Sequence, residues 1–258
     1  MKMPIQSTYK STCLATLLLC AASLATAGSL SVTVVDREGK PTQDAVVVLV
    51  PEAKGTAKIA LPTTATIAQE KMQFIPAVSI VPVGAKVKFI NNDPWDHHVR
   101  SSAAGAASFN AVASASSGAS SGASSGAAGS VPAKGIDLRL EGKSDGKPAK
   151  SAEVTMDKAG PQSATLLGCY LHGSMRGHVY VTDSAWTLKT NADGVAVFDD
   201  VPDGKVSIKV WQADQLIDAP TQISVVGAAP TKANVQLQAA VRKKRAETAA
   251  PSNYVNTR

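Results

Sequence analysis

Residues 168–181 read GCYLHGSMRGHVYV and contain three metal-binding residue types in one short stretch. Cys169, His172 and Met175 are spaced three positions apart, and the β-branched and aromatic residues that follow them predict a strand. A thiolate with two imidazoles makes a trigonal site that suits copper, and a weak axial thioether completes such a set. This stretch therefore supplies three candidate copper ligands on one loop, and the second imidazole has to come from elsewhere.

The chain has 4 histidines, and all of them fall in two short segments. His172 and His178 lie in the stretch above, whereas His97 and His98 lie in FINNDPWDHHVRS, residues 89–101. Imidazole is a preferred ligand of copper and zinc, so this clustering indicates a shared metal site. The remaining ligand is therefore His97 or His98.

The choice between the two adjacent histidines follows from strand geometry. Neighbouring residues on a strand point to opposite faces, so only one of the pair can face the site. Val99 favours burial, and it lies two positions after His97 and so on the same face of the strand. We therefore assign His97 as the ligand. His98 is then expected to face outward or to form a hydrogen bond outside the ligand set. By the same alternation, Val179 and Val181 point inward, which predicts a surface position for His178.

The first 27 residues have the pattern of a cleaved export signal. Two lysines precede an apolar run over residues 14–25, which is short for a bilayer span, and residues 25–27 (ATA) offer a small-residue cleavage site. A lipoprotein signal at Cys20 is disfavoured because Leu19 stands where a small residue is needed. We expect cleavage after Ala27, a periplasmic location and no transmembrane segment in the mature chain.

Cleavage at that point leaves one cysteine. Two of the 3 cysteines, Cys13 and Cys20, belong to the signal, so Cys169 stands alone in an oxidising compartment. A lone thiol there is prone to oxidation unless it is buried or bound to a metal. Because burial alone accounts for most free cysteines, the neighbouring ligand types have to support the metal hypothesis.

The formal net charge of +6 is concentrated at one end of the chain. Loss of the two signal-peptide lysines leaves 24 basic against 20 acidic residues, a net +4, and residues 242–245 (RKKR) supply four positive charges. The body of the protein is therefore close to neutral, which argues against a nucleic-acid-binding face. We expect residues 241–258 to form a basic, disordered tail.

The rest of the sequence has the pattern of an all-β protein. Residues 30–50 contain two β-branched runs around a Gly/Pro turn, and residues 86–90 and 177–183 continue the strand pattern without a convincing amphipathic helix. Packed β-sandwiches are the expected architecture. Residues 102–130 are dominated by Ser, Ala and Gly and cannot form a core, so we expect a flexible insert within one domain.

Residues 184–240 predict a further set of strands, with turns at residues 192–194 and 202–204 between three short runs. These runs resemble the latter part of the carboxypeptidase regulatory-like, transthyretin-type β-sandwich, whose opening strands resemble those within residues 28–65. Two arrangements are open. One is a single flanking sandwich that is split around the central domain, and the other is two sandwiches in sequence.

Residues 72–99 (MQFIPAVSIVPVGAKVKFINNDPWDHHV) resemble the opening half of the cupredoxins. The positions that match are Phe74, Pro76, Gly84, Val87, Phe89 and Asn92. The closing half, residues 168–181, is similar to cupredoxins of the amicyanin type, which have the same short Cys-His-Met spacing followed by Arg-Gly and a valine-rich strand. The whole is most similar to exported bacterial proteins of the plastocyanin-like or methylamine utilization type, which also have the double histidine.

The resemblance implies a cupredoxin Greek-key β-sandwich over residues 66–183 and one copper ion that cycles between Cu(II) and Cu(I). The implied ligands are His97, Cys169, His172 and Met175. The implied function is electron transfer rather than catalysis. The implied partner is a redox protein such as a c-type cytochrome or a periplasmic dehydrogenase.

Two positions depart from the family pattern. Gly173 and Ser174 stand where amicyanin-type loops have a proline and an aromatic residue, so the rim around His172 is looser and more polar. His98 stands where the family has an asparagine that ties the two ligand loops together. The identity of the partner therefore does not transfer with the resemblance, and the rigidity of the site stays open.

Enzymatic functions are disfavoured by the number of ligands. Multicopper oxidases and copper nitrite reductases need more histidines, a binuclear copper centre needs a second cysteine, and methionine is a rare zinc ligand. With every histidine near the metal motif, none is left to act as the base of a Ser-His-Asp triad. Copper capture, delivery or sensing without electron transfer is the main alternative, and an envelope scaffold without a metal is a third.

Overall fold

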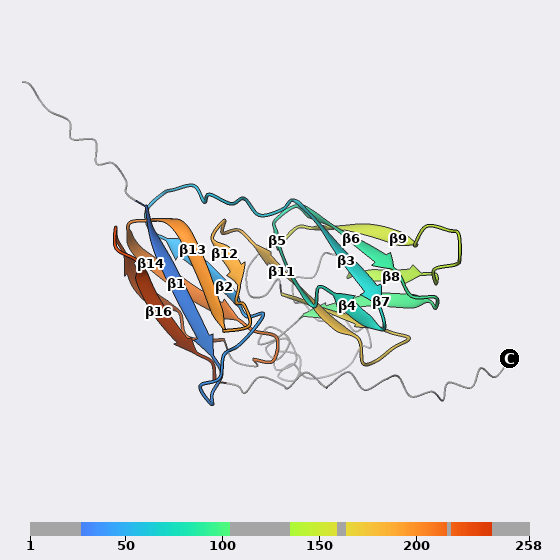
Figure 1. The fold of residues 1–258 in the computed structure, drawn as a ribbon. Coiled ribbons are helices and arrows are strands. Elements are labelled where there is room, and N and C mark those ends of the chain that lie inside the picture. Colours follow the sequence, from blue (N-terminus) through green and yellow to red (C-terminus); the bar gives the residue numbers. More distant parts are fainter. Residues whose placement is uncertain (1–26, 104–134, 159–163, 216–217, 239–258) are drawn as a thin grey trace, which may run out of the picture.

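The computed structural model describes residues 27–103, 135–158, 164–215 and 218–238, which form strands and loops without a helix (Figure 1). The described part of the chain is therefore all-β, and the predicted fold class is confirmed. It contains no helix with the length and apolar character needed to cross a bilayer. The expected signal peptide, the Ser/Ala/Gly-rich insert and the basic tail lie almost wholly outside the described residues.

The first sandwich consists of two sheets. Its strands are β3 (Thr64–Glu70), β4 (Gln73–Ile75), β5 (Val78–Pro82), β6 (Ala85–Asn91), β7 (His97–Ala103), β8 (Asp137–Leu140), β9 (Ser151–Met156), β10 (Thr165–Cys169) and β11 (Arg176–Thr182). One sheet has the order β4-β3-β6-β9, and the other has the order β5-β11-β10-β7-β8. This two-sheet arrangement is consistent with the expected cupredoxin β-sandwich.

Alternation of apolar and polar residues explains how these strands form a sandwich. In β6, Ala85, Val87 and Phe89 are buried, whereas the lysines between them are exposed. Buried side chains from the two sheets form one apolar core cluster, and Cys169 and Met175 belong to it. The predicted ligand loop is therefore anchored in the core of the first sandwich.

The second sandwich is built from both ends of the described chain. Its strands are β1 (Ala27–Val35), β2 (Val46–Pro51), β12 (Thr187–Lys189), β13 (Val195–Pro202), β14 (Gly204–Trp211), β15 (Gln222–Val226) and β16 (Thr231–Gln236). They form a three-stranded sheet in the order β13-β1-β16 and a four-stranded sheet in the order β12-β2-β14-β15. Strands that precede the first sandwich thus pair with strands that follow it. The likeness of this unit to the transthyretin type stays a prediction.

A tight turn between β12 and β13 takes the chain from one sheet of the second sandwich to the other. The Asn191 side chain accepts hydrogen bonds from the amides of Asp193 and Val195 at 3.0 and 2.9 Å. Gly194 follows with a φ of 73°, a left-handed conformation that glycine adopts without strain. A β-carbon at Gly194 would also lie 2.5 Å from the Val34 carbonyl oxygen, so this turn packs directly against β1.

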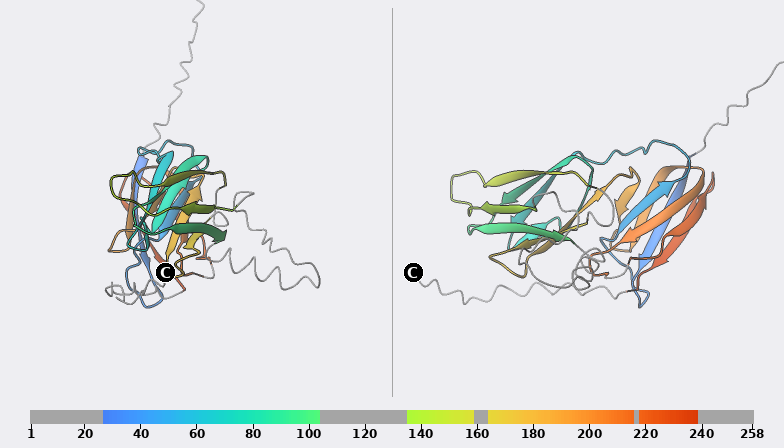
Figure 2. Two further views of the ribbon diagram at one scale, coloured as in Figure 1. Left: turned by 90° about the vertical axis from the view of Figure 1, so that its right-hand side faces the viewer. Right: turned by 180° about the vertical axis from the view of Figure 1, so that it is seen from behind.

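The two sandwiches, which lie side by side in the right view of Figure 2, meet through an apolar cluster. Its buried members are Val46, Val48 and Trp211 from the second sandwich and Val78, Ala164 and Tyr180 from the first. The centroid of the Trp211 ring lies 5.6 Å from that of Tyr180 and 5.5 Å from that of His178. The outer face of the five-stranded sheet is therefore partly covered by the second sandwich.

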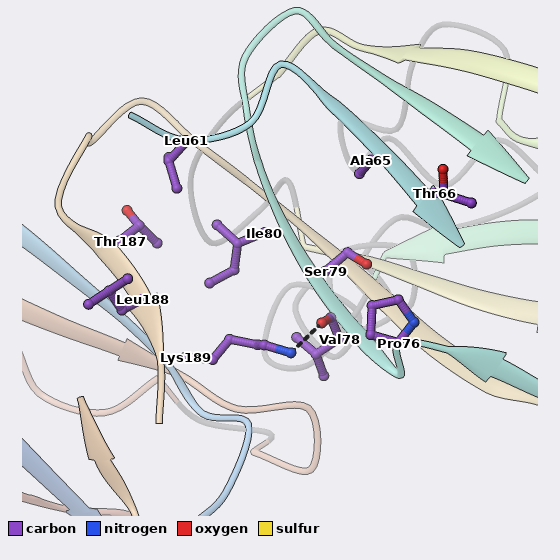
Figure 3. Close-up of a pocket in the computed structure, with 10 residues that line it drawn as sticks. All are labelled: Leu61, Ala65, Thr66, Pro76, Val78, Ser79, Ile80, Thr187, Leu188 and Lys189. Carbon is purple, nitrogen blue, oxygen red and sulfur yellow. Dashed lines mark hydrogen bonds between the residues drawn. The ribbon is translucent and has the colours of Figure 1, made fainter. Parts of the chain in front are cut away.

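A cavity of about 330 Å³ lies beside this junction (Figure 3). Its lining includes Val78 and Ser79 of β5, Leu188 and Lys189 of β12, and Leu61 from the loop between β2 and β3. The Lys189 ammonium donates a hydrogen bond to the Val78 carbonyl at 2.8 Å and so connects edge strands of the two sandwiches. No predicted metal ligand lines this cavity.

Candidate metal centre

Two strand ends and one loop bring the predicted histidine and cysteine ligands together. His97 is the first residue of β7, Cys169 is the last residue of β10, and His172 lies on the loop between β10 and β11. β7 and β10 are antiparallel neighbours, and Cys169 lies opposite Val99. The start of one strand and the end of the other therefore meet at the same end of the sheet.

The candidate ligand atoms form a small triangle. The Cys169 Sγ lies 3.5 Å from the Nδ1 atoms of His97 and His172, and these two nitrogens are 3.1 Å apart. A point equidistant from the three atoms lies about 2 Å from each, close to zinc–nitrogen and zinc–sulfur bonds of about 2.0–2.3 Å. Two imidazoles and one thiolate are also the trigonal set of copper sites. The residues present therefore fit the copper ion that the cupredoxin resemblance implies.

The cluster is closed on the core side and open on the loop side. His97 is fully buried and Cys169 is 5% exposed, whereas His172 is half-buried. Met175 is 1% exposed and lies in the same core cluster as Cys169. The structure thus groups His97, Cys169 and His172 around a common centre and buries the fourth predicted ligand, Met175, in the adjoining core.

Backbone hydrogen bonds hold the ligand loop in place. The His98 amide donates to the Cys169 Sγ at 3.4 Å, and the Tyr170 amide donates to the His98 carbonyl at 2.9 Å. The Met175 amide donates to the His172 carbonyl at 3.0 Å and closes the loop. A hydrogen bond to a thiolate stabilises its charged form. His98 therefore ties the two ligand segments together through its backbone, a point that the sequence alone left open.

The His98 ring points away from the cluster, in agreement with the strand alternation. His97 and Val99 are fully buried, whereas the His98 side chain is 23% exposed. The His98 Nε2 bonds the Asp137 carboxylate, which also accepts a hydrogen bond from Arg100 at 3.0 Å. These two bonds hold the pKa of the Asp137 carboxyl below its usual range. His98 thus contributes to the cluster through its backbone and not through its ring.

The surroundings of His172 favour its neutral imidazole over the charged form. Burial lowers the pKa of His172, and the neighbouring His97 acts in the same direction. A neutral imidazole carries a lone pair on one ring nitrogen, which is the form that binds a metal. The two Nδ1 atoms lie 3.1 Å apart, and when both carry a lone pair, a cation shared between them removes the repulsion. The cluster is therefore suited to a bound cation.

A buried carboxylate that sequence reasoning missed lies behind His97. Asp93 is 4% exposed, and its Oδ2 lies 2.8 Å from the His97 Nε2. Asp93 stands on the loop between β6 and β7, where neither the strand nor the helix period predicts which residues are in contact. The one available signal was an acidic residue four positions before a candidate ligand, because metal-binding histidines commonly bond a carboxylate through their second nitrogen.

Asn91, the last residue of β6, fixes the loop that carries Asp93. Its buried amide nitrogen donates hydrogen bonds to the carbonyls of Trp95, Leu140 and Glu141 at 2.8, 3.1 and 3.0 Å. Its side-chain oxygen accepts a hydrogen bond from the Asp93 amide at 3.0 Å. A fully bonded buried amide of this kind rigidifies the segments that it joins. The approach to His97 along this loop is therefore well defined.

His178 lies on the outer face of β11, as the alternation predicts, but it is half-buried. Val179 and Val181 are buried as expected, and the ring of His178 packs against Trp211 of the second sandwich. Burial lowers the pKa of His178 to about 4. The contact with Trp211 could not be predicted, because alternation within one strand shows which face a residue occupies and not whether another domain covers that face.

Comparison with known proteins gives distant likenesses. No family model and no curated protein matches the chain. An oxidized mutant of amicyanin has 18% sequence identity and a TM-score of 0.30, and the match covers 52% of this chain and 97% of that one. A purple cupredoxin from Nitrosopumilus maritimus has 17% identity and a TM-score of 0.27, with 46% and 99% covered. A copper-containing nitrite reductase from Thermus scotoductus has 16% identity and a TM-score of 0.28, with 58% and 28% covered.

The chain resembles cupredoxins. The resemblance stated from the sequence recurs among the solved structures, which include amicyanin and other cupredoxins. At these identities and TM-scores the likeness carries no argument about what this cupredoxin-like chain does. Its function is inferred below from the geometry of the cluster.

Proposed function

We propose that this protein is a mononuclear type 1, or blue, copper protein that transfers single electrons between redox partners. The observation that supports the proposal most is the convergence of the Cys169 Sγ and the Nδ1 atoms of His97 and His172 on one point. His97, Cys169, His172 and Met175 would hold the ion, with the Met175 thioether as the weakest donor. Bound copper supplies a one-electron Cu(II)/Cu(I) couple.

The surroundings of the cluster favour electron transfer because they keep the ligands still. Asp93 holds the buried ring of His97 through Nε2, and the His98 amide holds the sulfur of Cys169. Both ligands lie at the ends of paired strands of one sheet. Ligands that are fixed by their neighbours keep one geometry when the charge of the site changes, so little has to reorganise.

His172 is the ligand through which we expect electrons to enter or leave. It is half-buried, while Tyr170 and Leu171 on the same loop are 71% and 49% exposed. Two exposed side chains with apolar surface beside a half-buried ligand suit a small and transient contact with another protein. A c-type cytochrome or a periplasmic dehydrogenase fits this role, in the compartment to which the N-terminal export signal would direct the chain.

Copper capture, delivery or sensing is a second candidate function, and the open ligand loop favours it. Gly173 and Ser174 are both exposed. Apart from its chain neighbours, no heavy atom of the described residues lies within 4 Å of a β-carbon built at Gly173. A loop with this much space around His172 would let another protein reach the bound ion and exchange it.

The experiment that tests the proposal is a visible and electron paramagnetic resonance spectrum of the purified protein with one equivalent of Cu(II), followed by cycles of reduction and reoxidation. An intense blue band with narrow copper hyperfine splitting, recovered in every cycle, is expected for an electron carrier. Tight binding without the blue band would favour copper handling, and a lack of copper binding would contradict both functions.

A further inference from the structure

Asp93 joins a candidate metal ligand to the backbone of a neighbouring turn. Its Oδ2 lies 2.8 Å from the His97 Nε2 and accepts a hydrogen bond from the Met72 amide at 3.0 Å. Its Oδ1 accepts a hydrogen bond from the Lys71 amide at 2.6 Å. The side chain is 4% exposed, so these three N–H groups replace the water that a carboxylate would otherwise bind.

These contacts determine which nitrogen of His97 carries the proton. A carboxylate has only acceptor atoms, so the ring nitrogen that meets Asp93 has to be the donor. The proton of neutral His97 therefore lies on Nε2, and the lone pair lies on Nδ1, the atom that faces Cys169 and His172. The opposite tautomer would place two acceptors 2.8 Å apart at Asp93 and an N–H bond in the centre of the cluster.

The same carboxylate connects His97 to the turn between β3 and β4. Lys71 and Met72 form this turn with φ values of 51° and 60°, a left-handed conformation that side chains other than glycine seldom adopt. Their amides both point at Asp93, which stabilises the strained turn. The Asp93 carboxylate therefore holds both the Lys71–Met72 turn and the ring of His97 in place.

The charge of Asp93 is also expected to affect the reduction potential of a bound copper ion. A buried anion behind a ligand stabilises the more positive oxidation state of the ion, because the low dielectric of the interior weakens screening. His97 is fully buried, so bulk water does not shield this interaction. The expected effect is a lower reduction potential than a neutral group at this position would give.

We propose that Asp93 is a positioning residue of the copper site. It selects the Nε2–H tautomer of His97, anchors the ring to the Lys71–Met72 turn and lowers the reduction potential of the bound ion. The inference rests on the proposed copper function only for the third of these effects. The first two are properties of the protein chain and can be measured without metal.

The first test uses the metal-free protein. Nitrogen-15 NMR of the imidazole rings reports the tautomer of His97, and amide hydrogen exchange reports the Lys71 and Met72 bonds. Asp93→Ala is expected to give a mixture of tautomers and faster exchange of both amides. Asp93→Asn is expected to keep the Nε2–H tautomer of His97, because the oxygen of the new side-chain amide can still accept this hydrogen bond. The NH₂ group of the new side chain cannot accept, so the turn amide that faces it should exchange faster.

The matched control is Asp96→Asn. Asp96 stands on the same loop next to His97, but its carboxylate bonds Arg139 and the Gly142 amide, both at 2.9 Å. The Asp96→Asn substitution also removes one negative charge, but it does not affect a contact with the His97 ring. The His97 tautomer and the exchange of the Lys71 and Met72 amides should therefore not change. An unchanged tautomer in Asp93→Ala, or the same change in Asp96→Asn, would overturn the positioning role.

The second test is the reduction potential of the copper-loaded variants. Asp93→Asn is expected to raise the potential, and the rise in Asp96→Asn is expected to be smaller, because Asp96 is part-exposed and paired with Arg139. Equal potentials in Asp93→Asn and the parent protein would contradict the charge effect. If the parent protein binds no copper, the proposed function fails, while the tautomer experiment still decides the role of Asp93.

Discussion

Cys169 supplies the sulfur of the proposed site, and the intense visible band of a blue copper site comes from charge transfer between thiolate and copper. Cys169→Ala is therefore expected to abolish this band at saturating Cu(II). The buried side chain is small, so the free energy of unfolding of the metal-free protein should change by only about 1 kcal/mol. The absorption spectrum and a thermal melt check both points. Blue colour in the variant would contradict the assignment of Cys169.

The adjacent histidines allow a paired experiment. His97→Ala removes a fully buried ring with its nitrogen at the cluster, whereas His98→Ala leaves the backbone amide that bonds the Cys169 sulfur. We expect His97→Ala to weaken copper binding by at least tenfold, as loss of a ligand does, and His98→Ala to change it much less. A competitive chelator titration measures both affinities. A larger loss in His98→Ala would reverse the assignment.

Residue types and spacing were enough to predict which side chains gather at the cluster. The alternation of buried and exposed residues along a strand was enough to choose His97 over His98 as the ligand, because this alternation is a local property. Asp93 could not be predicted in the same way, since its contact with His97 depends on the path of the β6–β7 loop. The left-handed turn at Lys71 and Met72 could not be predicted from the sequence either, because neither residue favours that conformation by itself.

At the level of the strand, β11 links the ligand loop to the junction between the sandwiches. It begins directly after Met175, and its His178 packs against Trp211 with a pKa lowered to about 4 by burial. Between pH 6.5 and 4 the unfolded chain binds a proton that the folded chain excludes. Stability should therefore fall by up to about 3 kcal/mol as the pH drops through this range, and this group should have no effect above pH 7.

His178→Phe tests this pH dependence, since it keeps a ring against Trp211 and removes the titrating group. Urea unfolding of the metal-free protein at pH 7 and at pH 4.5 should show a smaller difference in the free energy of unfolding for the variant than for the parent. Equal differences in the two proteins would mean that His178 does not cause the acid sensitivity.

Strand patterns predicted single elements better than their partners. The alternation in β6 and the turn at residues 191–194 follow from local rules of side-chain direction and turn chemistry. The two runs within residues 30–50 are neighbours in sequence, yet β1 and β2 lie in different sheets and pair with strands far along the chain. Pairing of this kind depends on long-range packing, which a single sequence pattern does not encode.

For the molecule as a whole, the junction makes the two sandwiches depend on each other. Trp211 is 5% exposed and contacts the rings of Tyr180 and His178 across the junction. Trp211→Ala is expected to lower the free energy of unfolding by about 3–5 kcal/mol and to separate the unfolding of the two sandwiches in calorimetry. Trp95→Ala is the control, because Trp95 is 43% exposed. One transition at an unchanged temperature in Trp211→Ala would show that the junction contributes little.

The pairing of β1 has a consequence for the order in which the protein is made. Val32 of β1 pairs with Ala196 of β13 on one side and with Ala233 of β16 on the other, so the first described strand needs strands that come much later in the chain. The first sandwich can close while β1 and β2 still expose unpaired edges, which are sites of unwanted association between chains. Until β13 and β16 are available for pairing, the edges of β1 and β2 therefore have to be protected from association with other chains.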